Sequence, residues 1–323
     1  MENVIELITE LSGQGMSDKD VSAYIYDELG VVVANDTVRY HARRKGKKEE
    51  NRKKMEAEGI SKTLVLTDLH IPFHREDTII DIIMKHRNEI DTIIFGGDIV
   101  DCEGISSFPK EIRKPMIEEM EVAYKFLKRV DRLTPDVEKI MIWGNHEYRY
   151  VRYLENKGNE LNPFHSGNIL EEIVKGFTRY DRGRNKKTVY PPLSGNFKVV
   201  DKWFVQHGDM IVAHPKNFSK INLRTAVSTV DHFLARGMKF NTCGIGHTHK
   251  QGTTMRNGIW TIEFGCLCKP MDYADTGNIG YTPQNYGYAL VTQVEGVTDI
   301  NQSRAYILDL VDEVEGWEEE IHE

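Results

Sequence analysis

The sequence predicts an α/β protein with a small all-helical domain at its N-terminus. From residue 62 onwards, short apolar runs alternate with amphipathic helical patterns, which is the order expected of a sheet covered by helices. Before residue 45, the apolar residues recur only at the spacing of a helix. Of the 323 residues, 40% are apolar and 28% are charged, as is usual for a globular protein. No window contains the ~18 consecutive apolar residues of a membrane helix.

Residues 1–45 are expected to form three short helices. The first covers residues 4–11, where the apolar side chains fall on one face. The second follows Ser17, a capping residue with an acidic side chain three positions later, and ends at Gly30. The third starts near residue 35 and is basic and aromatic.

This arrangement resembles the helix-turn-helix fold, whose last helix enters the major groove of DNA. We therefore predict a DNA-binding module in residues 1–45, with Arg39, Arg43 and Arg44 as its DNA contacts. The alternative is a helical oligomerisation or protein-docking module whose basic face is only solvated. Residues 46–60 are charged and contain two glycines, and we interpret them as a linker.

The charge of the chain is unevenly distributed. The formal net charge is −8, from 42 Lys and Arg against 50 Asp and Glu, yet residues 43–54 contain eight basic residues and only two Glu. This asymmetry suggests a basic N-terminal part that can meet nucleic acid, joined to an acidic body with an acidic tail at residues 312–323.

The cysteines and the N-terminus indicate a reducing compartment. Four cysteines are too few and too dispersed for a disulfide framework, and we interpret Cys266 and Cys268 as strand positions rather than half of a zinc site. The N-terminus shows no signal-peptide pattern. We therefore expect a cytoplasmic protein, of a bacterium or of a phage-infected host.

Three predicted strands in the α/β part end in polar residues. These strands, at residues 62–67, 92–95 and 139–143, are separated by helices at about 76–88 and 115–132. The further elements expected are helix 148–154, strands 197–200 and 203–207, helix 219–236, and strands 242–245, 259–264, 287–293 and 303–309. The long, basic connection before residue 195 suggests additional elements or a function of its own.

The strand ends carry the residue types that bind metal ions. These residues are Asp68, His70, Asp98, Asn145, His146, His207, His247 and His249. Carboxylates, imidazoles and an amide, without a thiolate, suit a borderline metal such as Mn²⁺, Fe²⁺ or Zn²⁺ rather than copper. Because one ion does not need so many ligands, we predict two ions that share a bridging carboxylate.

Five short blocks occur in a fixed order, each after a predicted strand. They are Asp-x-His at 68–70, Gly-Asp-x-x-Asp at 97–101, Gly-Asn-His-Glu at 144–147, His-Gly at 207–208 and Gly-His-x-His at 246–249. The ordered set resembles the calcineurin-like metallophosphoesterase superfamily over about residues 62–250. This resemblance implies a four-layer α-β-β-α sandwich, with two mixed sheets flanked by helices, over residues 61–311.

The resemblance also implies which residues hold the metal ions. One ion would be held by Asp68, His70 and His249, the second by Asn145, His207 and His247, and Asp98 would bridge them. The fourth block leaves a choice between His207 and His214, and we favour His207 because it follows a predicted strand and precedes a glycine.

Four further residues are expected around the ions. By the resemblance, His146 is catalytic: it faces the scissile phosphate and protonates the leaving oxygen instead of binding metal. Asp101 is expected to accept a hydrogen bond that orients a ligand. Glu147 is expected to begin the next helix, where negative charge is favourable. Arg149 is a possible clamp for the substrate phosphate, and its alternative is a solvated helix face.

The predicted function is hydrolysis of phosphodiester bonds by a metal-activated water, on DNA or another nucleic acid bound through residues 1–45. The cofactors expected are two divalent metal ions, with Mn²⁺ favoured and Fe²⁺, Zn²⁺ or Ni²⁺ as alternatives. A first alternative is a phosphomonoesterase that acts on proteins or nucleotides. A second is a non-catalytic DNA-binding protein with a vestigial phosphoesterase domain, against which the intact ligand set counts. The block Gly-Asn-His-Glu followed by Tyr-Arg also resembles small phage and bacterial members of the superfamily.

Overall fold

The computed structural model describes residues 2–13, 16–39, 54–55, 57–107, 114–157, 165, 167–181, 183–270 and 284–309. The chain divides into two compact units, Met1–Ile60 and Ser61–Glu323. The predicted tail at residues 312–323 lies outside the described residues. Among the described residues, no helix combines the length and the apolar character that crossing a bilayer requires.

The N-terminal unit contains the helices that the sequence predicts. Helix α1 (Glu2–Gly13) is followed by α2 (Asp18–Leu29), and a further helical turn covers residues 35–39. The Ser17 hydroxyl accepts a hydrogen bond from the Asp20 backbone N–H at 3.2 Å, and Gly30 ends α2 at φ 65°. A small apolar cluster joins the three segments, formed by Val4, Ile8, Leu11, Val21, Ile25 and Val38.

The predicted DNA contacts are only partly described. The Arg39 guanidinium donates to the Asp18 carboxylate at 2.9 Å, so this arginine is engaged within its own unit. Arg43 and Arg44 lie outside the described residues. Of the predicted linker, residues 54–55 and 57–60 are described: 54, 55 and 57 are helical, 58–59 form a turn, and Ile60 begins the first strand.

The first sheet of the larger unit has seven strands in the order β13-β12-β1-β2-β3-β6, with β14 also pairing with β12. Its strands are β1 (Ile60–Leu66), β2 (Thr92–Gly96), β3 (Glu138–Ile142), β6 (Phe197–Val200), β12 (Tyr286–Val294), β13 (Val297–Thr298) and β14 (Arg304–Leu308). Strands β1, β2, β3 and β6 run parallel, whereas β12 pairs antiparallel with β13 and β14. The sheet is therefore mixed, as predicted.

The second sheet has five strands in the order β10-β11-β9-β8-β7. Its strands are β7 (Phe204–His207), β8 (Met210–Ala213), β9 (Thr242–Ile245), β10 (Gln251–Arg256) and β11 (Ile259–Phe264). Strands β8, β9 and β11 run parallel, and β7 and β10 are antiparallel to their neighbours. Strands β8 and β10 were not predicted from the sequence.

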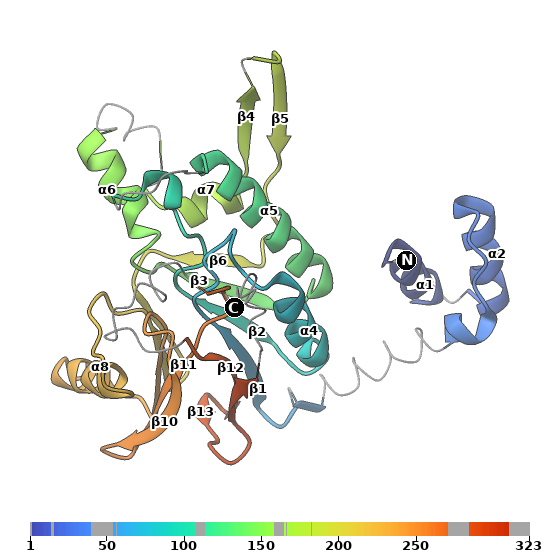
Figure 1. Ribbon diagram of the computed structural model, residues 1–323. Coiled ribbons are helices and arrows are strands. Elements are labelled where there is room, and N and C mark those ends of the chain that lie inside the picture. The colour runs from blue at the N-terminus through green and yellow to red at the C-terminus, as the bar shows by residue number, and fades with distance from the viewer. Residues whose placement is uncertain are drawn as a thin grey trace, which may run out of the picture. The chain divides into compact units, whose positions relative to one another are not determined.

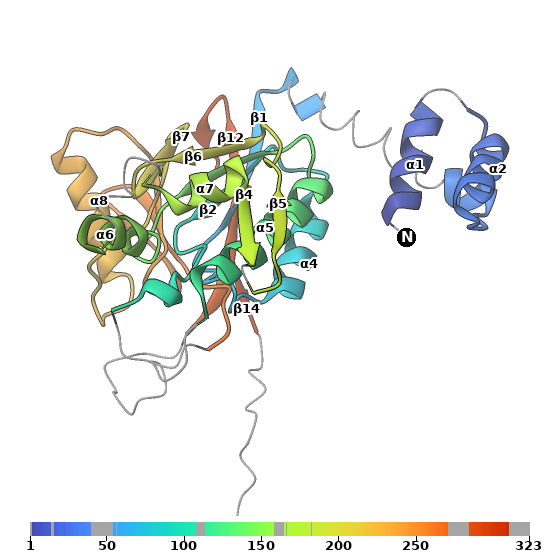
Figure 2. The same cartoon turned by 90° about the horizontal axis from the view of Figure 1, so that it is seen from above.

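The two sheets pack face to face, and helices cover their outer faces. Along β1, Val65 points into the apolar layer between the sheets, while Leu64 and Leu66 point to the helices, because successive side chains of a strand alternate. Helices α4 (Glu76–His86), α5 (Met116–Leu133) and α7 (Ile169–Lys175) cover the first sheet, and α8 (Arg224–Ala235) covers the second. Figures 1 and 2 show α8 and the α4–α5 pair on opposite sides of the sheets. The predicted four-layer α-β-β-α sandwich is confirmed.

The long connection after β3 contains elements that the sequence did not predict. It begins with α6 (Tyr148–Lys157), which corresponds to the predicted helix 148–154. The unpredicted elements are α7 and the antiparallel hairpin of β4 (Phe177–Asp181) and β5 (Lys186–Tyr190). Figure 1 shows this hairpin projecting from the body of the larger unit. The predicted helix 219–236 starts only at Arg224.

Candidate metal centre

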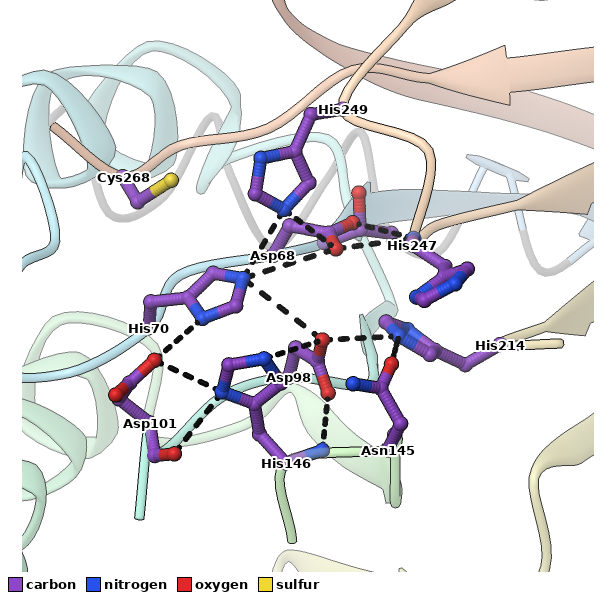
Figure 3. A network of polar contacts seen from close by, with 12 residues as sticks. Asp68, His70, Asp98, Asp101, Asn145, His146, His214, His247, His249 and Cys268 are labelled. Carbon is purple, nitrogen blue, oxygen red and sulfur yellow. Dashed lines mark hydrogen bonds and ion pairs between the residues drawn. The ribbon is translucent and has the colours of Figure 1, made fainter. Parts of the chain in front are cut away.

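Strands from both sheets deliver polar side chains to one place. In the first sheet, the parallel strands β1, β2 and β3 end just before Asp68, Asp98 and Asn145. In the second sheet, the parallel pair β8 and β9 ends just before His214 and His247. Figure 3 shows these side chains pointing toward one another. The carboxyl ends of parallel strands therefore build the site, as is common in α/β proteins.

The first group of side chains contains Asp68, His70 and His249. The Nε2 atom of His249 lies 3.1 Å from Nε2 of His70 and 3.3 Å from the Asp68 carboxylate. The Nδ1 atom of His70 lies 2.9 Å from the Asp101 carboxylate, which turns Nε2 toward the group. Two imidazole nitrogens and a carboxylate oxygen thus face one small buried space.

The second group contains Asn145, His214 and His247. The Nε2 atom of His214 lies 3.3 Å from the Asn145 side-chain oxygen, and its Nδ1 atom donates to the Gly96 carbonyl at 2.9 Å. The buried Nε2 atom of His247 has no hydrogen-bond partner among the residues that the structure describes. A buried nitrogen without a partner is costly, and a metal ion at this place would satisfy it.

Asp98 lies between the two groups. Its Oδ2 atom is 3.8 Å from Nε2 of His70 on one side and 3.1 Å from Nε2 of His214 on the other. Its Oδ1 atom accepts the backbone N–H of His146 at 2.9 Å. Only a carboxylate can offer anionic oxygens to two neighbouring cations, so the position of Asp98 fits a bridging ligand. The donor set as a whole fits two divalent ions.

The structure corrects the choice of His207. This residue ends β7, where its carbonyl accepts a hydrogen bond from the Gln293 side chain at 3.0 Å, and its charged neighbours are Glu138, Lys198 and Asp91. The tight β7–β8 hairpin reverses the chain at Gly208, so β8 is the strand that runs toward the site. The residue after β8 is His214, and it occupies the place that we expected for His207.

The electrostatics of the site are those of carboxylates surrounded by imidazoles. Burial would raise the pKa of Asp98, but His214 and His146 hold it well below its ordinary value. Burial opposes the charged form of His214, yet Asp98 raises the pKa of this imidazole to about 9. Burial and His214 lower the pKa of His247 to about 4. Without a metal, a proton on His214 therefore supplies the positive charge that Asp98 requires.

His146 lies beside the two groups and is oriented by Asp101. Its Nδ1 atom is 2.8 Å from the Asp101 carboxylate and 2.9 Å from the Asp101 carbonyl. Burial disfavours its charged form, but Asp98 and Asp101 raise the pKa of this imidazole. Its Nε2 atom lies 3.0 Å from the Arg149 guanidinium, which also donates to the Asp101 carbonyl at 2.9 Å. Arg149 therefore belongs to the site and not to a solvated helix face.

Five residues of the site adopt positive φ values that L-residues seldom take. They are Asp68 (53°), His70 (49°), Asp98 (48°), His247 (77°) and His249 (53°). The Glu147 carboxylate holds one of these loops in place, because it accepts the backbone N–H groups of Asp98, Ile99, Val100 and Gly144 at 2.6 to 3.1 Å. Glu147 directly precedes α6, as expected, but its carboxylate is buried against these loop N–H groups, and burial raises its pKa to about 7.

The family model of calcineurin-like phosphoesterases matches residues 61–275, which is more than half of the chain. The chain belongs to this family. The resemblance predicted from the five blocks is confirmed, and the matched residues contain both ligand groups, Asp98, His146 and Arg149.

The chain is also similar to solved structures at low identity. An archaeal phosphodiesterase is 13% identical, with 76% of this chain and 99% of that chain covered and a TM-score of 0.37. A metallophosphoesterase from Sphaerobacter thermophilus is 14% identical, with 77% and 88% covered and a TM-score of 0.36. Zinc-bound Vps29 from Entamoeba histolytica is 13% identical, with 76% and 98% covered and a TM-score of 0.33. No curated protein matches the chain.

Sequence reasoning missed some residues of this phosphoesterase site. The apolar run Met210-Ile211-Val212-Ala213, which ends at His214, could have indicated a strand that leads to a ligand. Buried Cys268, which we interpreted from the sequence as a strand position only, lies close to His70 and His249. The backbone N–H groups of Glu103 and Gly104 donate to the carboxylate of Glu119 on α5, which supports the loop after Asp101.

Proposed function

We propose that this phosphoesterase hydrolyses phosphodiester bonds with two divalent metal ions, of which Mn²⁺ is the favoured identity. The position of Asp98 between two groups of metal-binding side chains carries this proposal. Asp68, His70 and His249 would hold the first ion, Asn145, His214 and His247 the second, and Asp98 both. When bound, such ions act as Lewis acids on the phosphate and lower the pKa of a water nucleophile.

His146 supplies the proton for the leaving group. Asp101 fixes its Nδ1 atom, so that a proton on Nε2 is the one available for transfer. As the bond between phosphorus and the leaving oxygen breaks, that oxygen takes the proton from Nε2. The carboxylates of Asp98 and Asp101 favour the charged imidazolium before transfer, since both raise its pKa.

Arg149 recognises the phosphate in this proposal. Its guanidinium lies 3.0 Å from Nε2 of His146, the atom that must give its proton to the leaving oxygen. Nε2 cannot accept a hydrogen bond from Arg149 while it carries that proton. A phosphate oxygen is a stronger acceptor for a guanidinium than a neutral imidazole is. We infer that Arg149 turns to the phosphate when substrate binds, which frees Nε2 of His146 for the leaving oxygen.

The proposed substrate is DNA or another nucleic acid. The main support is the uneven charge of the chain, with eight basic residues in residues 43–54 of a protein with a net charge of −8. The described Arg39 is paired with Asp18, so Arg43 and Arg44 are the better contacts to test.

Activity on matched esters tests the proposal. Purified full-length protein with Mn²⁺ is assayed on methyl 4-nitrophenyl phosphate, 4-nitrophenyl phosphate and single-stranded DNA. We expect the diester and the DNA to be cleaved, and the double variant Arg43→Glu and Arg44→Glu to lose activity on DNA only. Cleavage of the monoester alone would make the protein a phosphomonoesterase and refute the proposal.

A further inference from the structure

A loop at the edge of the metal centre carries an exposed aromatic ring and a cation. This loop, residues 215–223, directly follows His214 and leads into α8. The Phe218 ring is 47% exposed, and its centroid lies 5.6 Å from that of His247. A half-exposed phenylalanine that contacts a candidate metal ligand lies where a substrate would bind.

The same loop places Lys216 on a second aromatic surface. The Lys216 ammonium lies 3.5 Å from the centroid of the Tyr148 ring, and Tyr148 stacks on Trp143 at 5.3 Å with 17° between the ring planes. Trp143 directly precedes Gly144 and Asn145, and Tyr148 directly precedes Arg149. The loop therefore adds a positive charge and planar rings to the edge of the metal centre.

Hydrogen bonds to two buried side chains hold this loop in place. The Lys250 ammonium donates to the carbonyls of Ser219 and Lys220 at 3.1 and 2.6 Å, and Lys250 is only 3% exposed. The Leu223 backbone N–H donates to the buried Glu263 carboxylate at 3.1 Å. Since Lys250 directly follows His249, the loop is tied to the metal centre itself. Its shape is thus set before any substrate arrives.

We propose that this loop forms a binding site for the nucleoside next to the scissile phosphate, with Phe218 stacking on the base and Lys216 contacting a neighbouring phosphate. The inference rests on the proposed phosphodiesterase function and specifies its substrate as a nucleotide. A flat aromatic ring can stack on any of the bases, because every base has a π-face. A lysine held over a tyrosine keeps its charge exposed to an anion. A phosphorylated serine or threonine side chain offers no ring to Phe218.

Two diesters with the same leaving group test this site. Thymidine 5′-(4-nitrophenyl phosphate) carries a base, and methyl 4-nitrophenyl phosphate does not. We expect kcat/KM to be about tenfold higher for the thymidine ester, which corresponds to the stacking of one base. Phe218→Leu should remove this preference, whereas Ile221→Ala, an exposed apolar control in the same loop, should keep it. An unchanged preference in the Phe218 variant would overturn the proposal.

Binding measured without turnover separates this inference from the proposed function. Titration calorimetry compares thymidine 5′-monophosphate with 2-deoxyribose 5-phosphate, which lacks the base. If neither diester is cleaved, the phosphodiesterase proposal fails, and tighter binding of the thymidine compound that depends on Phe218 still supports the site. Equal binding of the two compounds refutes it.

A variant of Lys216 tests whether the ligand is a free nucleotide or a nucleotide within a nucleic-acid chain. Lys216→Gln should weaken binding of a thymidine oligonucleotide about tenfold and leave thymidine 5′-monophosphate unaffected, with Lys220→Gln as the exposed control. Equal weakening of both ligands would support a site for free nucleotides. No effect on either ligand would overturn the role of Lys216.

Discussion

Replacing His214 by alanine should remove the second metal ion, whereas the same change at His207 should not. The Nε2 atom of His214 faces Asp98 at 3.1 Å and Asn145 at 3.3 Å. His207 is instead the last residue of β7, at the turn of the β7–β8 hairpin and near Glu138. Each variant removes one imidazole ring, and the two positions are only seven residues apart in the chain.

The size of the effect follows from the position of His214. Groups that only orient a metal ligand typically contribute 10- to 100-fold to metal affinity, so a direct ligand should contribute at least about 100-fold, or about 2.7 kcal/mol. In metal-free protein, His214→Ala also leaves the buried Asp98 carboxylate without its nearest positive partner. Such a loss typically destabilises a protein by about 3 kcal/mol.

Metal counting and thermal unfolding measure both effects. Variants are loaded with Mn²⁺ and gel-filtered, and bound metal is determined by atomic emission. Wild type and His207→Ala should retain two ions per chain, and His214→Ala one. With chelator present, His214→Ala alone should unfold at lower temperature. A His207 variant that loses one ion, beside a His214 variant that keeps two, would refute the assignment of the second group.

Three more predictions concern residues that do not bind metal. His146→Asn should keep both ions and lose turnover by about 10² to 10⁴-fold, so a variant that loses metal but keeps its rate would contradict the proposed role. Arg149→Met should move the pH–rate profile to higher pH, because its guanidinium lies 3.0 Å from Nε2 and lowers the pKa of His146. Burial raises the pKa of Glu119 to about 7, so the folded protein retains a proton that the unfolded chain releases above about pH 4.5. Glu119 therefore makes the free energy of unfolding fall as the pH rises from about 4.5 to 7. Measured by urea unfolding, Glu119→Gln should become more stable relative to wild type across this range, by up to about 3 kcal/mol. A difference between the two proteins that does not change with pH would contradict this prediction.

The parts of the site that the sequence predicts are those that follow a strand whose direction the sequence also indicates. Asp68, Asp98 and Asn145 follow β1, β2 and β3 within three residues, and these neighbouring strands run parallel, so their carboxyl ends lie at the same edge of the sheet. The same logic placed His247 and His249 after β9. The order of the five blocks then identified the family without any three-dimensional information.

The parts that could not be predicted depend on contacts across the fold. His207 and His214 both follow short apolar runs, and only the pairing of β7 with β8 decides which residue reaches the site. The carboxylate of Glu147 looks like a helix start in the sequence, yet four backbone N–H groups from two loops converge on it. Periodicity describes one element at a time and cannot show such convergence.

Glu147 supports part of a strained backbone. Five non-glycine residues of the site have positive φ values, and each costs of order 1 kcal/mol relative to an ordinary conformation. The total is comparable to the net stability of a whole domain, about 5–15 kcal/mol, so the surrounding contacts must hold these residues in place. Glu147 fixes the loop after Asp98, and the Asp68 carboxylate accepts the backbone N–H of His247 at 2.9 Å. Contacts within the protein therefore hold these five residues in their positive-φ conformations.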